Sequence, residues 1–253
     1  MAHEPGKSEG LQLLALSEPL DNVHVPASVN AVFAAALVAL HIRARRFVKA
    51  VFCLLDQGLS IEAEVLNRAL LETTVLARWI AKDPSSRVDR WRLSDLEERI
   101  KWHDGYEKAA TAQGLQPNDS SLIPAERYAE FVDEAARLRS EGVKSVPDLL
   151  QMSEDIGNSD IYHLAYRQGC QSFAHPQFLA LERFMDWKGD GSWDVRANAP
   201  SAEVDTEPYE TAAIWLYLIM EIGAEAPGIP WRKEHLKSVE ESILGGIARR
   251  TVE

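Results

Sequence analysis

The 253-residue sequence lacks most of the features that assign a chain to a specialised class. It has two cysteines, Cys53 and Cys170, which lie far apart and do not have the spacing of metal ligands. Disulfide scaffolds and cysteine-rich metal sites need more cysteines at closer spacing. We therefore expect a buried, reduced pair of thiols in a cytosolic protein.

Long apolar runs and targeting segments are also missing. The first ten residues are polar, and no charged segment followed by an apolar one comes after them. The most apolar run, residues 31–40, is too short to span a bilayer and is followed by His41 and a group of arginines. A buried helix explains this run, so we expect a cytoplasmic protein with no membrane partner.

The known sequence patterns of catalytic, phosphate and metal sites are absent as well. The chain has no glycine-rich phosphate loop after a strand, no G-x-S-x-G turn, no H-E-x-x-H, and no two Glu-x-x-His pairs. Glu72, His103, His163 and His175 could hold a metal by residue type, but no spacing supports it. We therefore expect no metal and no cofactor. The net charge of -12 disfavours broad attraction to nucleic acid or anionic membranes, although a local basic patch is compatible with it.

What the chain does have is helical periodicity. Apolar residues recur at steps of three and four, and glycine, proline and capping residues separate the periodic segments. This pattern predicts an all-α fold, a multi-helix bundle, with residues 1–26 as a loose leader and residues 27–253 as a single helical domain. Asp190-Gly191 permits one small β-hairpin near 186–195. We expect helices over residues 27–57, 61–81, 85–113, 124–140, 147–156, 162–174, 177–187, 209–224 and 232–250.

The predicted helix Ile61–Ala81 carries an unusual pair of charges. On a helical wheel Glu64, Asn67, Thr74 and Arg78 form a narrow polar arc, and apolar residues fill the opposite side. Glu72 falls inside the apolar sector, with Arg68 at its edge. Because burying a lone charge is costly, we expect Glu72 to be mostly buried and paired with Arg68 or with a group from residues 162–176.

The segment Tyr162–Pro176 gathers polar and aromatic side chains into one helix length. Tyr162 and Tyr166 share one face, and His163 and Arg167 share the next. Proline disfavours helical geometry in the residue before it, so the helix should end at His175, which could then point into a crevice. Two interpretations stay open for His163 and His175, a site or a partnered core histidine. For His103-Asp104 the alternatives are a ligand or base pair and an exposed, cap-like feature.

These two segments resemble a known family. Arg68-Ala-Leu-Leu-Glu72 resembles the R-x-x-x-E helix of an uncharacterised bacterial family, domain of unknown function 5677. Tyr166, followed by Ser172 and His175-Pro176, resembles the second motif of that family, and the similarity covers Ala31–Phe184. The resemblance implies an all-helical fold without a settled activity.

A more distant similarity is to the HEPN superfamily of helical proteins, which includes RNA-cleaving toxins and antiphage effectors. The superfamily signature is an arginine followed, after four to six residues, by a histidine at a helix end. In this chain seven residues separate Arg167 from His175. An unbroken helix would hold the two side chains about 12 Å apart along its axis, so a catalytic pair requires a break before His175.

Two hypotheses of function follow from these residues. We favour a binding or interaction domain with a polar crevice between Ile61–Ala81 and Tyr162–Pro176, whose partner is an unidentified ligand or protein. The alternative is a metal-independent endoribonuclease acting on RNA, with His175 as general acid or base and Arg167 stabilising the phosphate charge. A homodimer is compatible with either hypothesis. The polar cluster of the crevice comprises Arg68, Glu72, His163, Tyr166 and Ser172.

Overall fold

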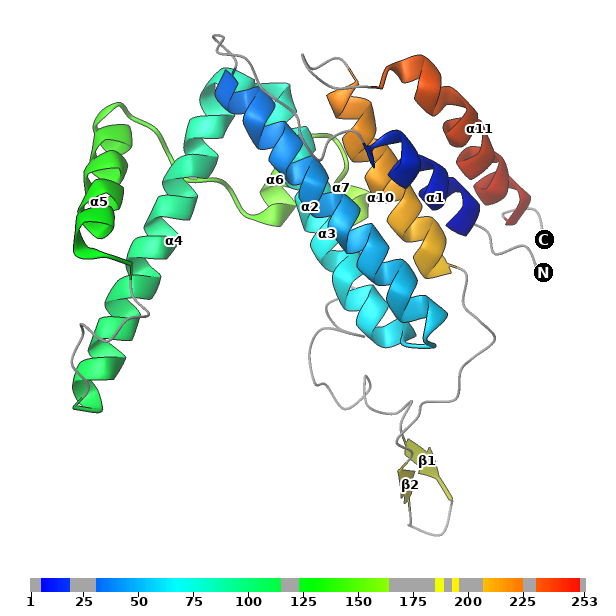
Figure 1. Cartoon of the computed structure of the whole chain (residues 1–253), viewed down its shortest axis with the longest axis horizontal. Coiled ribbons are helices and arrows are strands. Elements are labelled where there is room, and N and C mark those ends of the chain that lie inside the picture. The colour runs from blue at the N-terminus through cyan, green and yellow to red at the C-terminus, as the bar shows by residue number, and fades with distance from the viewer. Residues whose placement is uncertain are drawn as a thin grey trace. The chain divides into compact units, whose positions relative to one another are not determined.

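The computed structural model describes residues 6–18, 31–114, 123–163, 185–188, 193–195, 207–224 and 231–250 (Figure 1). These residues form an all-α fold with one short hairpin, as the sequence predicts. The helices are α1 (Lys7–Leu16), α2 (Ala31–Asp56), α3 (Ser60–Lys82), α4 (Pro84–Ala112), α5 (Ala125–Ser140), α6 (Leu149–Asp155), α7 (Ser159–Ile161), α10 (Glu207–Gly223) and α11 (Lys233–Arg250).

Most predicted helix ends in the described part of the chain agree with the structure, because they depend on local chemistry. The helix predicted over residues 177–187 is wrong at its end, where Met185–Trp187 form a strand. Helix α2 ends before Gly58, whose φ of 74° is a left-handed conformation that glycine adopts at little cost. There Gly58 N–H donates to Leu55 O at 3.0 Å, and Leu59 N–H donates to Leu54 O at 2.9 Å. Such bonds satisfy the last carbonyls of a helix and stop it. Gly142, with a φ of 81°, occupies the equivalent position after the C-terminal end of α5.

The two strands form the expected hairpin. Strand β1 (Met185–Trp187) pairs antiparallel with β2 (Trp193–Val195), and Asp186 lies opposite Asp194. The hairpin falls within the predicted region near 186–195, and it is the only sheet among the residues that the structure describes.

The chain divides into two compact units, whereas the sequence predicted a single domain over residues 27–253. Unit 1 comprises Met1–Lys82 and Leu149–Glu253, and unit 2 comprises Asp83–Asp148. Helices α4 and α5 of unit 2 cover each other's apolar stripes. Leu93, Ala135 and Leu138 are buried in one cluster, and the partly buried Leu96, Ile100 and Val143 pack against it. Periodicity reports that a helix has an apolar stripe but not which partner covers it.

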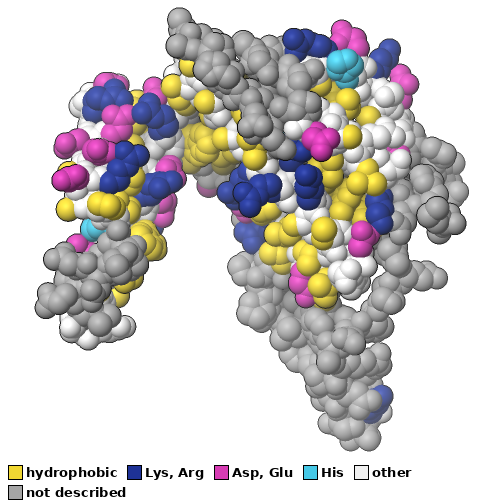
Figure 2. Space-filling model, viewed as in Figure 1, with side chains coloured by type: hydrophobic (Ala, Val, Ile, Leu, Met, Phe, Trp, Pro, Cys, Tyr) yellow, Lys and Arg dark blue, Asp and Glu magenta, His cyan; other side chains and the backbone are white. Residues whose placement is uncertain are grey.

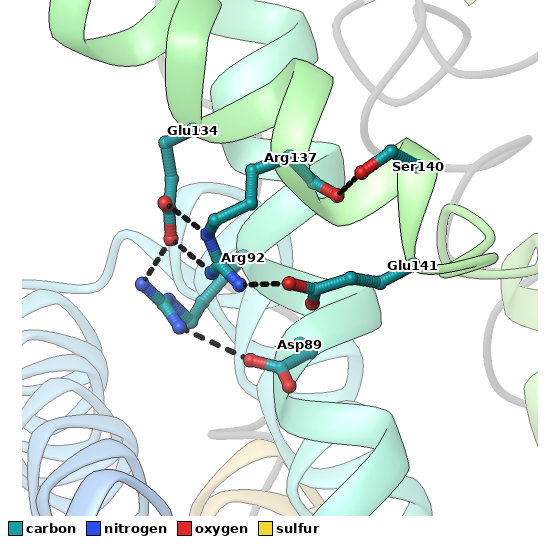
Figure 3. A network of polar contacts seen from close by, with 6 residues as sticks. All are labelled: Asp89, Arg92, Glu134, Arg137, Ser140 and Glu141. Carbon is teal, nitrogen blue, oxygen red and sulfur yellow. Dashed lines mark hydrogen bonds and ion pairs between the residues drawn. The ribbon is translucent and has the colours of Figure 1, made fainter.

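Ion pairs reinforce the contact between α4 and α5 (Figure 3). Arg92 pairs with Asp89 on its own helix at 3.1 Å and reaches Glu134 of α5 at 2.6 Å. Arg137 pairs with Glu134 at 2.9 Å and with Glu141 at 2.6 Å. These side chains are partly exposed, so the network fixes how the two helices align more than it stabilises them.

In unit 1, helix α10 packs against α1, α2, α3 and α11, and α2 packs along α3 (Figure 1). Among the buried side chains of α10 are Tyr209, Ala212, Ala213, Trp215, Leu216, Ile219 and Met220. Because all these partners bury their apolar faces on it, α10 is the centre of the described core of this unit.

The predicted polar arc of α3 is wrong at two positions. Asn67 and Thr74 are buried against α10 instead of facing solvent. The Asn67 amide donates to Pro208 O at 3.1 Å, and the Thr74 hydroxyl donates to Leu70 O at 2.9 Å, with Trp215 O at 3.4 Å. Backbone carbonyls therefore accept hydrogen bonds from the Asn67 amide and the Thr74 hydroxyl inside the core, while Asn67 Oδ1 has no partner among the described residues. A helical wheel cannot anticipate such long-range partners.

Within the region predicted as a leader, residues 1–26, residues 7–16 form helix α1. Leu13 and Leu14 of this helix are buried. Lys7 Nζ lies 2.6 Å from the Asp56 carboxylate, which also accepts a hydrogen bond from the Tyr209 hydroxyl at 2.6 Å. Through these contacts α1 joins the C-terminal end of α2 to the start of α10.

Two further observations bear on the sequence predictions. Cys53 is exposed, so the expectation that both cysteines are buried is wrong at that position. The described helices include none whose length and apolar content would allow it to cross a bilayer.

Close approach at Gly10 generates the first testable prediction. A Cβ at this position would lie 2.3 Å from Phe52 Cζ and 3.5 Å from Ala213 Cβ, so no larger side chain fits without displacing α1. We expect Gly10→Leu to lower the free energy of unfolding by about 1–3 kcal/mol, the usual cost of overpacking. Denaturant unfolding followed by circular dichroism measures it.

The matched control is Gln12→Leu, which adds the same side chain at an exposed position of the same helix. It should leave the free energy of unfolding within about 0.5 kcal/mol of wild type. Equal stabilities for the two variants would show that α1 is not held against α2 and α10.

Candidate functional site

Helix α3 brings the two charged residues of the first motif together. Arg68 Nη2 lies 3.3 Å from Glu72 Oε1, as the spacing of four residues on a helix allows. The Arg68 side chain is 24% exposed and the Glu72 side chain 43% exposed. The prediction that Glu72 is mostly buried is therefore wrong, although its contact with Arg68 is present.

The physical reason is the direction in which α3 faces the core. Its buried side is centred on Ala63, Leu70 and Thr74, which α2 and α10 cover. The opposite side is the half-exposed face of α3, where apolar side chains surround the ion pair and Val65 is 40% exposed. This face is formed by Val65, Arg68, Ala69, Glu72 and Leu76.

Most of the second motif lies outside the described residues. Tyr166, Arg167, Ser172 and His175 all fall there, as does the predicted packing of residues 162–174 on α3. His163 is described and exposed, so it is not the core histidine that one interpretation allowed. Its ring meets that of Tyr162 edge-on, with the centroids 5.5 Å apart.

A histidine that the sequence interpretation passed over, His41, is buried in the core of unit 1. Its ring lies 4.5 Å from that of Trp231, and neither ring nitrogen has a hydrogen-bond partner among the described residues. Burial, and then the charge of Arg45, lower the pKa of His41 from 6.5 to about 3. His41 is therefore a neutral core residue at physiological pH. Its place in one buried stripe with Leu37, Ala44 and Val48 was the available signal.

In unit 2, His103 and Asp104 belong to a contact between α4 and α5. His103 is buried, and its ring stacks on that of Tyr128 with the centroids 4.1 Å apart. The Tyr128 hydroxyl donates to Asp104 Oδ1 at 2.7 Å, and this bond, with burial and nearby acidic charge, raises the pKa of Tyr128. The cap-like, exposed interpretation is thus wrong for His103, which packs as an aromatic side chain.

The described part of the chain contains three of the four candidate metal ligands, Glu72, His103 and His163. No group of three or more His, Cys, Asp or Glu side chains there has an arrangement that could hold a metal ion. Of the four side chains weighed as ligands, His175 lies outside the described residues, His103 is buried against Tyr128, and Glu72 is paired with Arg68.

Comparison with known families now adds to this geometry. Residues 34–192 match the Family of unknown function (DUF5677), a region that includes both motifs and more than half of the chain. The chain belongs to this family. The DUF5677 region contains α3–α7 and most of α2, while α1, α10 and α11 lie outside it. No curated protein and no solved structure matches the chain.

The exposure of the ion pair predicts how much it stabilises the fold. We expect Glu72→Ala to lower the free energy of unfolding by at most about 1 kcal/mol, because water already solvates much of the carboxylate. A buried pair would cost about 3–5 kcal/mol. Denaturant unfolding distinguishes the two, with Asp95→Ala, at the exposed Asp95–Arg99 pair, as the matched control.

The pKa of His41 predicts how stability depends on pH. An unfolded chain binds a proton on this histidine below about pH 6.5, whereas the folded protein does not until about pH 3. Stability is therefore lost as the pH falls, and His41 accounts for about 2 kcal/mol between pH 7 and pH 5. Chemical unfolding measured at both pH values should show a shallower dependence in His41→Leu.

The matched control for this prediction is His163→Leu, because the exposed ring of His163 stays in water when the chain folds. This variant should keep the wild-type dependence on pH. A His41→Leu protein with that same dependence would contradict a buried, neutral His41.

Proposed function

We propose that this DUF5677 protein is a binding or interaction domain whose site joins the half-exposed face of α3 to the segment Tyr162–Pro176. The single observation that carries the proposal is the Arg68–Glu72 ion pair, held on a helix face that α2 and α10 leave half-exposed. The partner is a ligand or protein segment with polar and charged groups.

Energetics favour a recognition role for the pair. A partly exposed ion pair typically adds only about 0.2–1 kcal/mol to stability, so the fold gains little from it. A guanidinium presents several donors in a planar fork that suits a carboxylate or phosphate, and Glu72 can accept hydrogen bonds beside it. Together the two side chains suit a partner that carries both an acidic group and a donor.

The neighbouring side chains extend this surface in two ways. Val65 and Leu76 offer apolar area next to the charges, and such a combination is typical of the centre and rim of protein interfaces. Tyr166, Ser172 and His163 would add two hydroxyls and an imidazole from the second motif. These groups form hydrogen bonds without requiring a reaction.

Metal-independent RNA cleavage remains a sequence-based alternative, carried by Arg167 and His175. The described residues add no observation in its favour, and the net charge of -12 opposes attraction to RNA. We therefore keep RNA cleavage as an outcome of the test.

The experiment is affinity purification of the tagged full chain, with bound proteins and small molecules quantified by mass spectrometry. We expect Arg68→Glu to lose the partners that the wild type retains, because it reverses the charge next to Glu72. The matched control is Arg99→Glu, which makes the same change at another helical ion pair, Asp95–Arg99, of 2.6 Å. This control should retain the wild-type partners.

Three results would contradict the proposal. The first is a wild-type protein that retains no more than the tag alone does. The second is an Arg68→Glu protein that retains the same partners as the wild type. The third is cleavage of a single-stranded RNA oligonucleotide by the wild type that His175→Ala abolishes.

A further inference from the structure

Helix α4 of unit 2 exposes two neighbouring aromatic side chains. Trp102 is 55% exposed and Tyr106 36% exposed, and their ring centroids lie 5.9 Å apart. They lie one helical turn apart, on the side of α4 away from the Leu93, Ile100 and His103 stripe. Tryptophan and tyrosine are enriched among the residues that dominate binding energy at interfaces, so two such side chains at the surface call for an explanation.

Small residues lie beside the two aromatic residues on the helix surface. Gly105 is inside α4, where a glycine typically destabilises a helix by about 1 kcal/mol relative to alanine. A Cβ on Gly105 would meet no atom within 4 Å, so no contact within the described structure requires a glycine. Ala109, one turn further, is exposed too. A glycine at an open position becomes useful when another backbone or a large side chain approaches it closely.

We propose that Trp102, Gly105, Tyr106 and Ala109 form a docking face for α4 of a second copy of this chain, packed antiparallel to the first. A two-fold interface must be self-complementary, because the same patch faces itself. This face supplies both a large side chain, Trp102, and a gap, Gly105, three residues apart. We take the antiparallel register in which each Trp102 lies level with Gly105 of the other copy.

The charges around the face fit a second copy better than a strongly charged partner. Arg99 is paired with Asp95 at 2.6 Å, and Lys101 with Glu98 at 3.3 Å. Figure 2 shows basic and acidic side chains interspersed over this unit. Lys108, beside Ala109, follows the acidic Glu107, so the charges around the face are of both signs. A nucleic acid would therefore find no run of positive charge here, and two copies would not repel each other through charges of one sign. In the antiparallel register Lys101 lies level with Tyr106 of the other copy, where an aromatic ring attracts a cation.

Sedimentation velocity of the full chain over a range of concentrations tests the proposal. We expect a reversible dimer in the wild type, and a dimer dissociation constant raised at least about tenfold in Trp102→Ala and in Gly105→Leu. Leucine is favoured over glycine in helices, so Gly105→Leu should keep or raise the thermal midpoint while it weakens the dimer. The matched control is Val132→Ala, at an exposed apolar residue of α5, which should keep the dimer.

Three outcomes would overturn the proposal. The first is a wild type that stays monomeric at every concentration reached. The second is a dimer that either Trp102→Ala or Gly105→Leu leaves unchanged. The third is a dimer that Val132→Ala weakens as much as the two test variants do. The dimer would form whether or not the half-exposed face of α3 binds a partner, so the failure of one proposal leaves the other standing.

Discussion

The burial of α10 is the interaction on which the described part of unit 1 depends. Ala212, Leu216 and Ile219 of this helix are completely buried, and α2 and α3 both pack against it (Figure 1). The carbonyls of Pro208 and Trp215 accept hydrogen bonds from polar side chains of α3, the Asn67 amide and the Thr74 hydroxyl, whose burial would otherwise be costly. Because α10 packs against the side of α3 that carries Asn67 and Thr74, the side with Arg68 and Glu72 stays half-exposed. The exposure of the candidate site therefore follows from the way α10 packs against α3 in the core.

The sequence predicted the elements of the fold better than their partners. Residues such as Gly58 and Gly142 end helices through their own backbone geometry, so the boundaries of α2 and α5 could be predicted locally. Which face of a helix is covered depends on elements distant in sequence. Asn67 and Thr74 look polar along the chain but are buried, because carbonyls of α10 accept hydrogen bonds from the Asn67 amide and the Thr74 hydroxyl. For the same reason α1 and the division into two units could not be predicted.

The candidate site was predicted only in part. A spacing of four residues brings Arg68 and Glu72 together on any helix, so their contact followed from the sequence. Their exposure did not, because it depends on the orientation of α3. His41 was overlooked because it falls just after an apolar run, although its helical spacing from Leu37, Ala44 and Val48 indicated the same buried stripe. The DUF5677 match includes both motifs but assigns no role to either.

The central claim, that the two motifs form one site, is tested most directly by the Hε1 proton resonance of His175 in the NMR spectrum. The resonance can be assigned from its loss in His175→Ala and then compared between wild type and Glu72→Ala. If the motifs meet, removing the carboxylate changes the electric field at the imidazole, and the resonance moves. Glu98→Ala, at an exposed glutamate of α4, should not move it. A His175 resonance at the same position in wild type and Glu72→Ala would contradict the claim.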